Sequence, residues 1–496
     1  MISIEADSQL PVLIQGGMGV GISHWKLARA VALAGKKLDQ PVLGVVSGTG
    51  VELLLVRRLQ DGDPGGHMQR ALAAFPYSEI SEQIINDYYT DVKKPPTARY
   101  RQTPRPSDLL SSNSEYRRAM NQLSVAANFV EVYLAKEGHN RPIGINHLEK
   151  IQLLALPRLY GAMLAEVDYV LEGAGIPDQV PGVLDHFANR ETAQYKIDVI
   201  GSKERAEVTF DPRELDEGSP TLKRPPFLAV IASNLLAKVL VSNRVSGYVN
   251  GFIVEGPTAG GHNAPPRGKF QLNDRGEPIY GDKDVVDLEQ LATLDRPFWL
   301  AGSYGSPARL AEALASGATG IQVGTVFALS EESGMRSDIK EQLLRQLADK
   351  GALDIFTSLV ASPTGFPIKI VQETGTLSEK ETYDDRKRRC TLGHLDQPYL
   401  TPKGTIGVRC PAEPVGAYVQ KGGDILKTKG SICFCNGLLT TAGYPQQDKL
   451  GIEPPVITLG DDVRSIQGVP KKEDGSYNAE DAIRYLLRDH IADSTA

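Results

Sequence analysis

Short apolar runs that alternate with helix-forming segments are the feature that most constrains the fold of this chain. Runs that are apolar throughout are typical of strands buried on both faces of a parallel sheet. The segments between them carry helix start and stop signals, such as the Ser-Pro at 306–307 and the glycine at 317. Eight runs occur, at 11–15, 41–47, 142–146, 167–171, 227–233, 251–255, 298–302 and 319–324. Eight such units predict an α/β fold of the TIM (β/α)8 barrel type, and a doubly wound sheet is the competing architecture.

Three stretches do not fit a bare barrel. Residues 52–140 are polar and helix-prone, and they are too long for a simple connection, so they predict a helical lobe inserted after the second strand. Residues 263–296 predict a hairpin or lid. Beyond about residue 380 the alternation stops, which divides the chain into a barrel domain at 1–380 and a C-terminal, cysteine-containing extension at 381–496.

Composition indicates a soluble enzyme. Of the 496 residues, 41% are hydrophobic and 23% charged, and the net charge of −7 argues against a nucleic-acid or membrane-surface partner. The opening residues, MISIEADSQL, have no basic segment followed by an apolar core, and no apolar stretch approaches the ~18 residues of a membrane span. We therefore expect a cytoplasmic protein that acts on a small molecule, and we expect it to form a homo-oligomer.

Glycine-rich turns follow the predicted strands. In a TIM barrel the chemistry lies at the carboxyl ends of the strands, where small residues let backbone N–H groups approach a ligand. The loops after the last two strands commonly bind phosphate, and small residues with a threonine hydroxyl suit that role. These strand ends are QGGMGVG (15–21), Asn146, EGAGIP (172–177), EGPTAGGH (255–262), AGSYGSP (301–307) and VGTVF (323–327).

The same turns carry a resemblance to a known family. PVLIQGGMGVGIS, EGAGIP, VEGPTAGGHNAP and AGSYGSPARLAEALASGATGIQVGTVFALSEES resemble the flavin-dependent nitronate monooxygenases, once called 2-nitropropane dioxygenases, and the related flavin-containing enoyl-[acyl-carrier-protein] reductases. The similarity spans roughly residues 1–375 without the two insertions.

The resemblance implies a barrel that binds FMN non-covalently. Gly16, Gly17 and Met18 would lie along the isoalloxazine ring, with Asn146 at its polar edge. The phosphate would lie between Gly302, Ser303, Gly324 and Thr325. Gly261 precedes the histidine, His262, that the family places beside the flavin.

The chain departs from the family pattern at two turns. Ser303 and Tyr304 stand where the phosphate turn usually ends in Gly-Ile, and Pro257 and Thr258 stand where Glu-Ala-type sequences are common. The insertion at 52–140 and the C-terminal segment are also absent from the minimal enzymes. These departures leave room for a substrate other than a small nitronate.

His262 is the candidate catalytic residue. An imidazole can take a proton from a carbon acid or give one to an enolate. The alternative is a buried histidine hydrogen-bonded to a strand end. With the glycines around it, we favour the acid/base role, with the flavin performing the redox step.

Other polar residues are weaker candidates. Glu149 and Lys150 could reach the flavin or form the first turn of an exposed helix, and His147 could face away from Asn146. Glu172 and Glu255 end strands and could anchor loops. Five further histidines are expected to be structural or solvent-facing: His24, His67, His186, His394 and His490.

All four cysteines lie within residues 390–435. In a cytosolic protein such clustering is more often metal-binding than disulfide-forming. Four thiolates suit a structural zinc or a [4Fe–4S] cluster, although the spacing matches no usual signature, and four free thiols remain the alternative. The predicted ligands are Cys390, Cys410, Cys433 and Cys435.

Three functions are open at this point. The first is an FMN-dependent oxidoreductase (monooxygenase) that oxidises a nitronate or similar carbon acid. The second is a flavin-dependent enoyl-thioester reductase that uses NAD(P)H or another electron donor. The third is a non-catalytic barrel that acts as a scaffold.

Overall fold

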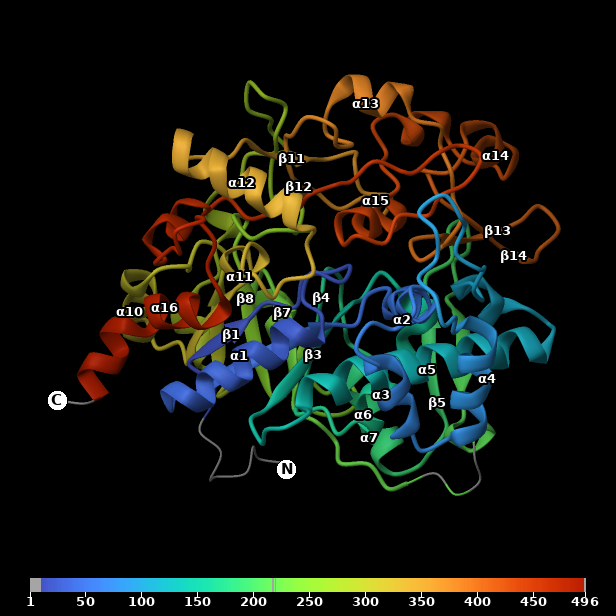
Figure 1. Cartoon of the computed structure of the whole chain (residues 1–496), viewed down its shortest axis with the longest axis horizontal. Coiled ribbons are helices and arrows are strands. Elements are labelled where there is room, and N and C mark those ends of the chain that lie inside the picture. The colour runs from blue at the N-terminus through green and yellow to red at the C-terminus, as the bar shows by residue number, and fades with distance from the viewer. Residues whose placement is uncertain (1–9, 216–217, 219, 495–496) are drawn as a thin grey trace.

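Eight parallel strands close into a barrel in the computed structural model, which describes residues 10–215, 218 and 220–494 (Figure 1). Around the barrel the strand order is β1-β10-β9-β8-β7-β4-β3-β2. The barrel strands are β1 (Leu13–Gln15), β2 (Val42–Ser47), β3 (Ile143–Leu148), β4 (Tyr169–Gly173), β7 (Phe227–Ile231), β8 (Gly251–Glu255), β9 (Phe298–Ala301) and β10 (Gly320–Val323).

The closed sheet confirms the predicted TIM barrel and excludes the doubly wound alternative. Each of the eight apolar runs overlaps one barrel strand, and β3 and β4 extend two residues beyond their runs. All residues of β1, β2, β4 and β9 are buried, as expected for strands covered on both faces. The barrel interior is filled by side chains such as Leu43, Leu228 and Trp299, so the barrel is a packed core and not a channel.

A ring of helices covers the barrel, one after each strand. The last member, α16, packs between α1 and α10, although more than 150 residues separate it from β10. The ring helices are α1 (Trp25–Leu38), α5 (Ser114–Lys136), α6 (Ala155–Leu164), α7 (Val180–Ala188), α8 (Asn234–Leu240), α9 (Leu288–Ala292), α10 (Pro307–Ala315) and α16 (Ala479–Ser494).

The segment predicted as a helical lobe is helical, but its last helix belongs to the ring around the barrel. α5 packs between α1 and α6 and therefore belongs to the ring. The preceding helices are α2 (Val51–Gln60), α3 (His67–Ala73), α4 (Ser78–Tyr88) and the 3-10 helix η1 (Pro106–Leu110). In the segment predicted as a hairpin or lid, an antiparallel bridge joins Leu272 to Pro278, before the short helix η4 (Asp282–Asp284).

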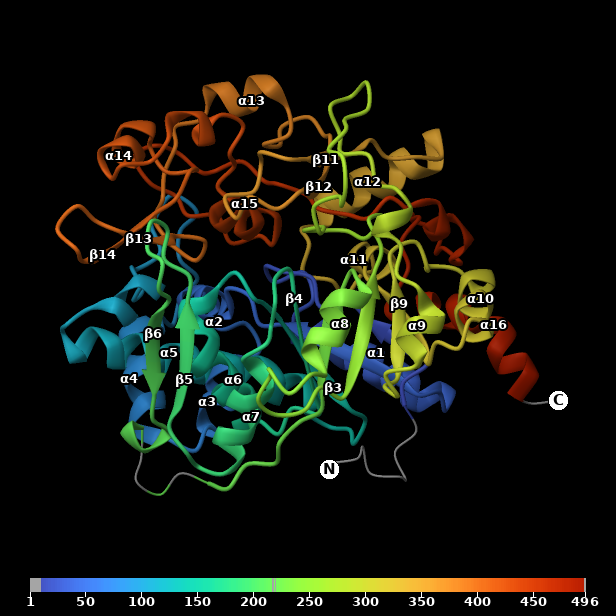
Figure 2. The ribbon, with the colours of Figure 1, turned by 180° about the vertical axis from the view of Figure 1, so that it is seen from behind.

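A hairpin that the sequence analysis did not predict connects β4 to β7. It consists of β5 (Ala193–Ile197) and β6 (Ala206–Phe210), visible from behind in Figure 2. The 3-10 helix η3 (Pro212–Glu214) follows β6, and another, η2 (Gln152–Leu154), lies earlier in the chain, between β3 and α6.

The chain between β10 and α16 forms a cap over the carboxyl ends of the strands (Figures 1 and 2). Residues beyond 380 are therefore not a separate tail, because α16 returns to complete the helical ring. The elements of the cap are α11 (Thr325–Ala328), α12 (Ser337–Lys350), β11 (Ile355–Ser358), β12 (Ile368–Val371), α13 (Lys380–Asp385), β13 (Gln397–Leu400), β14 (Ile406–Arg409), α14 (Val415–Gln420), η5 (Ile425–Thr428), α15 (Phe434–Thr441) and η6 (Arg464–Gly468).

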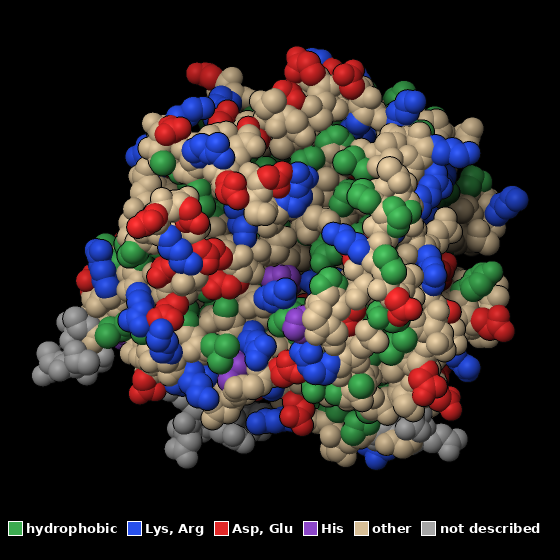
Figure 3. Space-filling view, in the orientation of Figure 1, with side chains coloured by type: hydrophobic (Ala, Val, Ile, Leu, Met, Phe, Trp, Pro, Cys, Tyr) green, Lys and Arg blue, Asp and Glu red, His purple; other side chains and the backbone are tan. Residues whose placement is uncertain are grey.

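Acidic and basic side chains are interspersed over the face seen in Figure 3. Within the described ranges, none of the helices combines the length and apolar character needed to cross a bilayer. The expectation about a secretory signal concerns residues 1–9, which lie outside the described residues.

Candidate active site

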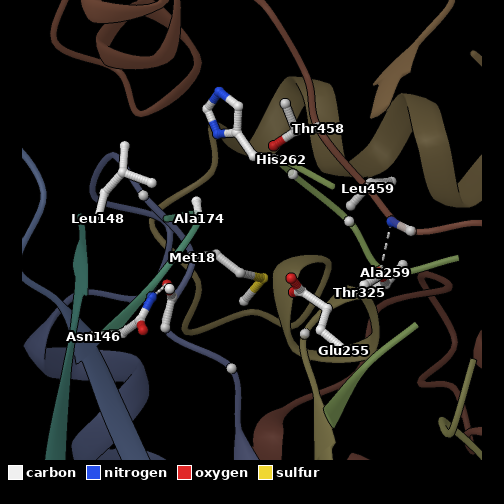
Figure 4. A pocket seen from close by; sticks show the side chains of 18 of the residues that line it. Met18, Asn146, Leu148, Ala174, Glu255, Ala259, His262, Thr325, Thr458 and Leu459 are labelled. Carbon is white, nitrogen blue, oxygen red and sulfur yellow. Dashed lines mark hydrogen bonds between the residues drawn. The ribbon is translucent and has the colours of Figure 1, made fainter. Parts of the chain in front are cut away.

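The carboxyl ends of all eight barrel strands open into one cavity of about 260 Å³ (Figure 4). The cavity contains every residue that the sequence predicted for cofactor binding or catalysis: Gly16, Gly17, Met18, Asn146, Gly261, His262, Gly302, Ser303, Gly324 and Thr325. Residues up to about 310 positions apart along the chain therefore meet in one place because parallel strands end on the same side of the barrel.

One wall is the turn after β1, which is held by buried hydrogen bonds. The Ser23 hydroxyl donates to the Gly16 carbonyl (2.8 Å) and accepts from the Met18 N–H (2.9 Å). The Asn146 side-chain amide donates to the Gly17 carbonyl at 3.1 Å. A Cβ on Gly17 would lie only 2.5 Å from the Cβ of Asn146, so this close approach of two backbones requires glycine.

The turns after β9 and β10 form the end of the cavity predicted to bind phosphate. Gly302 and Ser303 both have left-handed backbone conformations, with φ of 89° and 60°. Thr325 is the first residue of α11, and the N–H groups in the first turn of a helix have no partner within that helix. The Thr325 hydroxyl accepts from the N–H of Gly460 at 2.9 Å, so the cap closes over this end.

These residues fit a flavin phosphate through backbone donors. No lysine or arginine lines the cavity among the described residues, so the N–H groups of these turns and the N-terminus of α10 are the available positive dipoles. A Cβ on Gly302 would lie 3.0 Å from the Ala259 N–H nitrogen, which shows how closely the two turns approach. The cavity is therefore suited to a ligand held by amides and flanked by small residues.

His262 lies on the turn after β8, and a cap residue fixes its ring. Its Nε2 is 2.6 Å from the Ser362 hydroxyl, which is itself 2.8 Å from the Thr364 hydroxyl. An antiparallel bridge between His262 and Ile368 holds the backbone. Burial lowers the pKa of His262 to about 4, because the enclosed site disfavours the charged imidazolium. The side chain is therefore a neutral imidazole at pH 7.

Glu255, at the end of β8, is the acidic group of the cavity. Its side chain points toward the same space as Met18 and Thr325 in Figure 4. Burial raises the pKa of its carboxyl group to about 8. The site thus combines a neutral imidazole with a protonated carboxylic acid. The sequence had favoured His262 for catalysis, whereas Glu255 was only a weak candidate.

The cap provides an apolar roof that the sequence analysis did not anticipate. The residues from the cap that line the cavity include Ile368, Leu395, Phe434, Cys435 and Leu438. The ring centroid of Phe434 is 6.2 Å from that of His262. An apolar surface next to the candidate base favours a substrate with an apolar group.

The other weaker candidates are held in ion pairs or in the interior. Glu149 pairs with Lys150 at 3.1 Å, and Glu172 pairs with Arg158 at 2.8 Å. The Glu172 pKa is raised to about 7, chiefly by burial. These contacts assign Glu149, Lys150 and Glu172 to the support of the strand ends.

Two further histidines line the cavity. His147 is buried, and neither of its ring nitrogens has a hydrogen-bond partner among the described residues. Desolvation lowers its pKa well below the usual value. His394 was expected to be structural or solvent-facing, whereas it is buried in the cavity wall with Glu52 beside it. No sequence pattern indicated this pair, because 341 residues separate its members.

The four cysteines are close together, as their clustering in the sequence suggested. Cys410 and Cys433 are buried in one small cluster, and Cys390 and Cys435 pack against it. In the described part of the chain, however, no group of three or more His, Cys, Asp or Glu side chains is arranged to hold a metal ion. The predicted zinc or iron–sulfur site is therefore not supported.

A hydrogen bond with Cys390, together with burial, raises the pKa of Cys410 well above the usual value, and burial raises that of Cys433 to about 12. These surroundings favour neutral thiols over thiolates.

No protein-family model matches the chain, and no curated protein sequence matches it. Solved structures with a similar arrangement include FabK from Thermotoga maritima, with 16% identity, a TM-score of 0.43 and coverage of 98% of this chain and 94% of that one. A nitroalkane oxidase from Streptomyces ansochromogenes has 15% identity, a TM-score of 0.44 and 98% coverage of both chains. The enoyl reductase domain of MlnA from Bacillus amyloliquefaciens has 12% identity, a TM-score of 0.42, and coverage of 98% and 95%. These values are too low to transfer an activity.

Proposed function

We propose that this protein is an FMN-dependent oxidoreductase of the nitronate monooxygenase type, which oxidises a nitronate or a similar carbon acid. The observation that carries the proposal is the single cavity in which glycine turns from β1, β9 and β10 surround a neutral histidine. A flat cofactor with a phosphate at one end suits walls of backbone amides, and a carbon acid suits the imidazole.

The residues proposed to hold FMN all line the cavity. The turn Gly16–Met18 and the amide of Asn146 would bind along the ring, and the turns at Gly302–Ser303 and Gly324–Thr325 would bind the phosphate. Glu255 and Gly261 also line this cavity. Bound FMN supplies the two-electron redox chemistry and the reaction with oxygen.

His262 is proposed to handle the proton. With a neutral carbon acid such as a nitroalkane, and with its Nε2–H donated to the Ser362 hydroxyl, His262 has on Nδ1 the lone pair that takes the α-proton. A nitronate is already deprotonated, and His262 would then orient the anion. Because burial keeps the ring neutral at pH 7, the base is ready without a prior deprotonation. Ser362 fixes the orientation of the ring, and the cap excludes water from the reacting atoms.

A second candidate is a flavin-dependent enoyl-thioester reductase that takes electrons from NAD(P)H. The observation that favours it is Glu255, whose pKa of about 8 keeps a proton on the carboxyl group at neutral pH. Such a group can deliver a proton to the enolate carbon that remains after hydride has reached the neighbouring carbon. A neutral His262 is poorly suited to donating a proton to the enolate carbon. For this reason we rank the reductase as the second candidate.

A direct comparison of substrates tests the proposal. The purified holoenzyme is mixed with ethyl nitronate under air, and oxygen consumption is followed. In parallel, NADH or NADPH and crotonyl thioesters are supplied, and NAD(P)H oxidation is followed. Oxygen uptake with the nitronate supports the first function, and enoyl-dependent NAD(P)H oxidation supports the second. A folded protein that binds no FMN and performs neither reaction would leave the non-catalytic scaffold as the remaining hypothesis.

A further inference from the structure

Cys390 and Cys410 lie at the two ends of the segment that contains the β13–β14 hairpin. In this hairpin Gln397 pairs with Arg409, so the preceding Asp396 and the following Cys410 are adjacent at its open end. The Cys390 thiol donates a hydrogen bond to Asp396 Oδ1 at 3.3 Å. Both thiols are free and pack in the same small cluster. The two cysteines therefore meet beside one carboxylate.

Arg105 places a positive charge next to Cys390. Its Nη2 donates to Cys390 Sγ at 3.7 Å and lies 3.4 Å from Asp396 Oδ2. Cys390 thus has a carboxylate that can accept its proton and a guanidinium that can stabilise the sulfur anion. Cys390 itself is half-buried, and the Arg105 side chain is 39% exposed, so this side of the cluster faces solvent.

The partner thiol is more enclosed. Cys410 is 6% exposed, and Cys433, in the same cluster, is 5% exposed and accepts a hydrogen bond from the Asn436 amide at 3.3 Å. A partly accessible thiol beside a cation, with a second thiol next to it, is typical of cysteine pairs that react with peroxides. In such pairs the first thiol is oxidised and the second converts the product into a disulfide.

We propose that Cys390 and Cys410 form a modification site at which a hydroperoxide produces a reversible disulfide. With hydrogen peroxide, the Cys390 proton passes to Asp396, and the thiolate attacks one oxygen atom. The S–O bond forms, the O–O bond breaks, and the departing hydroxide takes the proton from Asp396 to become water. The Cys410 thiol then attacks the Cys390 sulfur, so that the S–S bond forms, the S–O bond breaks and a second water leaves. Two thiols lose two electrons, and one peroxide becomes two waters.

The disulfide would join the two ends of a segment that supplies part of the cavity wall. His394 and Leu395 lie between the two cysteines and line the cavity. Oxidation would therefore restrain the cap next to the candidate active site. This chemistry needs neither a cofactor nor a substrate of the enzyme, so it goes beyond the proposed function and can be tested separately from it.

Hydrogen peroxide in small molar excess, added to the reduced full-length protein, tests the site. The remaining thiols are counted after denaturation with a chromogenic disulfide reagent, and linked peptides are identified by mass spectrometry. The variants are Cys390→Ser and Cys410→Ser. Cys433→Ser is the matched control, because its thiol belongs to the same cluster but not to the pair.

We expect the wild-type protein to fall from four thiols to two, with Cys390 linked to Cys410, and dithiothreitol to restore all four. Cys433→Ser should also lose two thiols and form the same link. Cys390→Ser should keep its thiols, and Cys410→Ser should stop at a sulfenic acid on Cys390, which dimedone traps.

A wild-type protein that keeps its four thiols would overturn the proposal. A link between any other two cysteines would do the same, as would the loss of two thiols from Cys390→Ser. The wild-type thiol count and the identity of the linked peptides decide the question even where a variant fails to fold.

Arg105 acts through Cys390 as a positioning residue, and the rate of disulfide formation tests that role. Arg105→Gln removes the charge and should slow the reaction by about tenfold, whereas Arg105→Lys keeps the charge and should remain within about threefold of wild type. Arg99→Gln, which replaces an exposed arginine of the same connecting segment, is the control and should match wild type. Equal rates in wild type and Arg105→Gln would contradict the role of Arg105.

Discussion

The Nε2 atom of His262, on the turn after β8, lies 2.6 Å from the hydroxyl of Ser362, a residue 100 positions later in the cap. The catalytic candidate belongs to the barrel, but the group that orients it does not. The barrel and the cap therefore both contribute to the site. The barrel supplies the residues suited to a cofactor, and the cap supplies orientation, the apolar roof and the removal of solvent.

Replacing His262 tests the acid/base assignment. With a neutral nitroalkane as substrate, His262→Ala should retain FMN and lower the rate of flavin reduction by about 10²–10⁴-fold, the usual contribution of a general base. The rate is measured by anaerobic stopped-flow absorbance. His186→Ala is the control, because His186 is exposed and far from the chemistry assigned to the cavity. Unchanged flavin reduction in His262→Ala would exclude the role.

Removing the hydroxyl that orients His262 should have a smaller effect. Ser362→Ala keeps the imidazole and its proton-accepting capacity, so we expect flavin reduction to slow by about 3–30-fold while FMN affinity stays constant. An effect as large as that of His262→Ala would show that Ser362 itself takes part in the chemistry.

The pH dependence of kcat/KM follows from the lowered pKa of His262. A base must be unprotonated, and burial shifts the protonation of this imidazole down to about pH 4. Activity should therefore stay level between about pH 5 and 7 for a substrate that does not itself titrate there. It should fall only as the pH approaches 4. An inflection near pH 6.5 that disappears in His262→Gln would contradict the burial of this ring.

Glu255 should make stability depend on pH. Its pKa is raised from 4.5 to about 8 in the folded protein, so between these values the native state binds more protons than the unfolded state. This contribution to stability is complete below pH 4.5 and is lost as the pH rises through 8. Glu255→Gln should therefore be about 1–3 kcal/mol more stable than wild type at pH 8 and nearly equal to it at pH 5. Urea unfolding at both pH values measures this, with the exposed Glu312→Gln as the control.

The close approach at Gly17 predicts a loss of cofactor binding. A Cβ at this position would lie 2.5 Å from the Cβ of Asn146, so Gly17→Ala must displace the turn or the asparagine. We expect FMN affinity to fall by at least about 100-fold and stability to fall by about 1–3 kcal/mol. FMN fluorescence quenching measures the affinity. Gly281→Ala is the matched control, because an added Cβ there meets no described atom within 4 Å.

The barrel and the location of the site could be predicted because both depend on local sequence. A buried parallel strand is a continuous apolar run, and a strand end that approaches a ligand needs small residues. Thus β2, with six buried residues, and the turn at Gly16–Met18 were both recognisable. The resemblance to a flavoenzyme family rests on the same turns.

The features that could not be predicted depend on contacts between residues far apart in the sequence. The pairing of Glu52 with His394 and the return of α16 to the ring leave no periodic signal. The β5–β6 hairpin does alternate between buried and exposed residues, but it lies outside the barrel pattern and was overlooked. The cysteines illustrate a further limit: proximity in sequence predicted proximity in space, but not the arrangement of side chains that a metal requires.

The most direct test of the central claim is the FMN content of the purified protein. Its visible absorption spectrum is recorded, and the flavin released on denaturation is identified and quantified against the protein concentration. We predict flavin absorbance and about one FMN per chain, either as purified or after incubation with FMN and gel filtration. A correctly folded protein that remains colourless after that incubation would contradict the account.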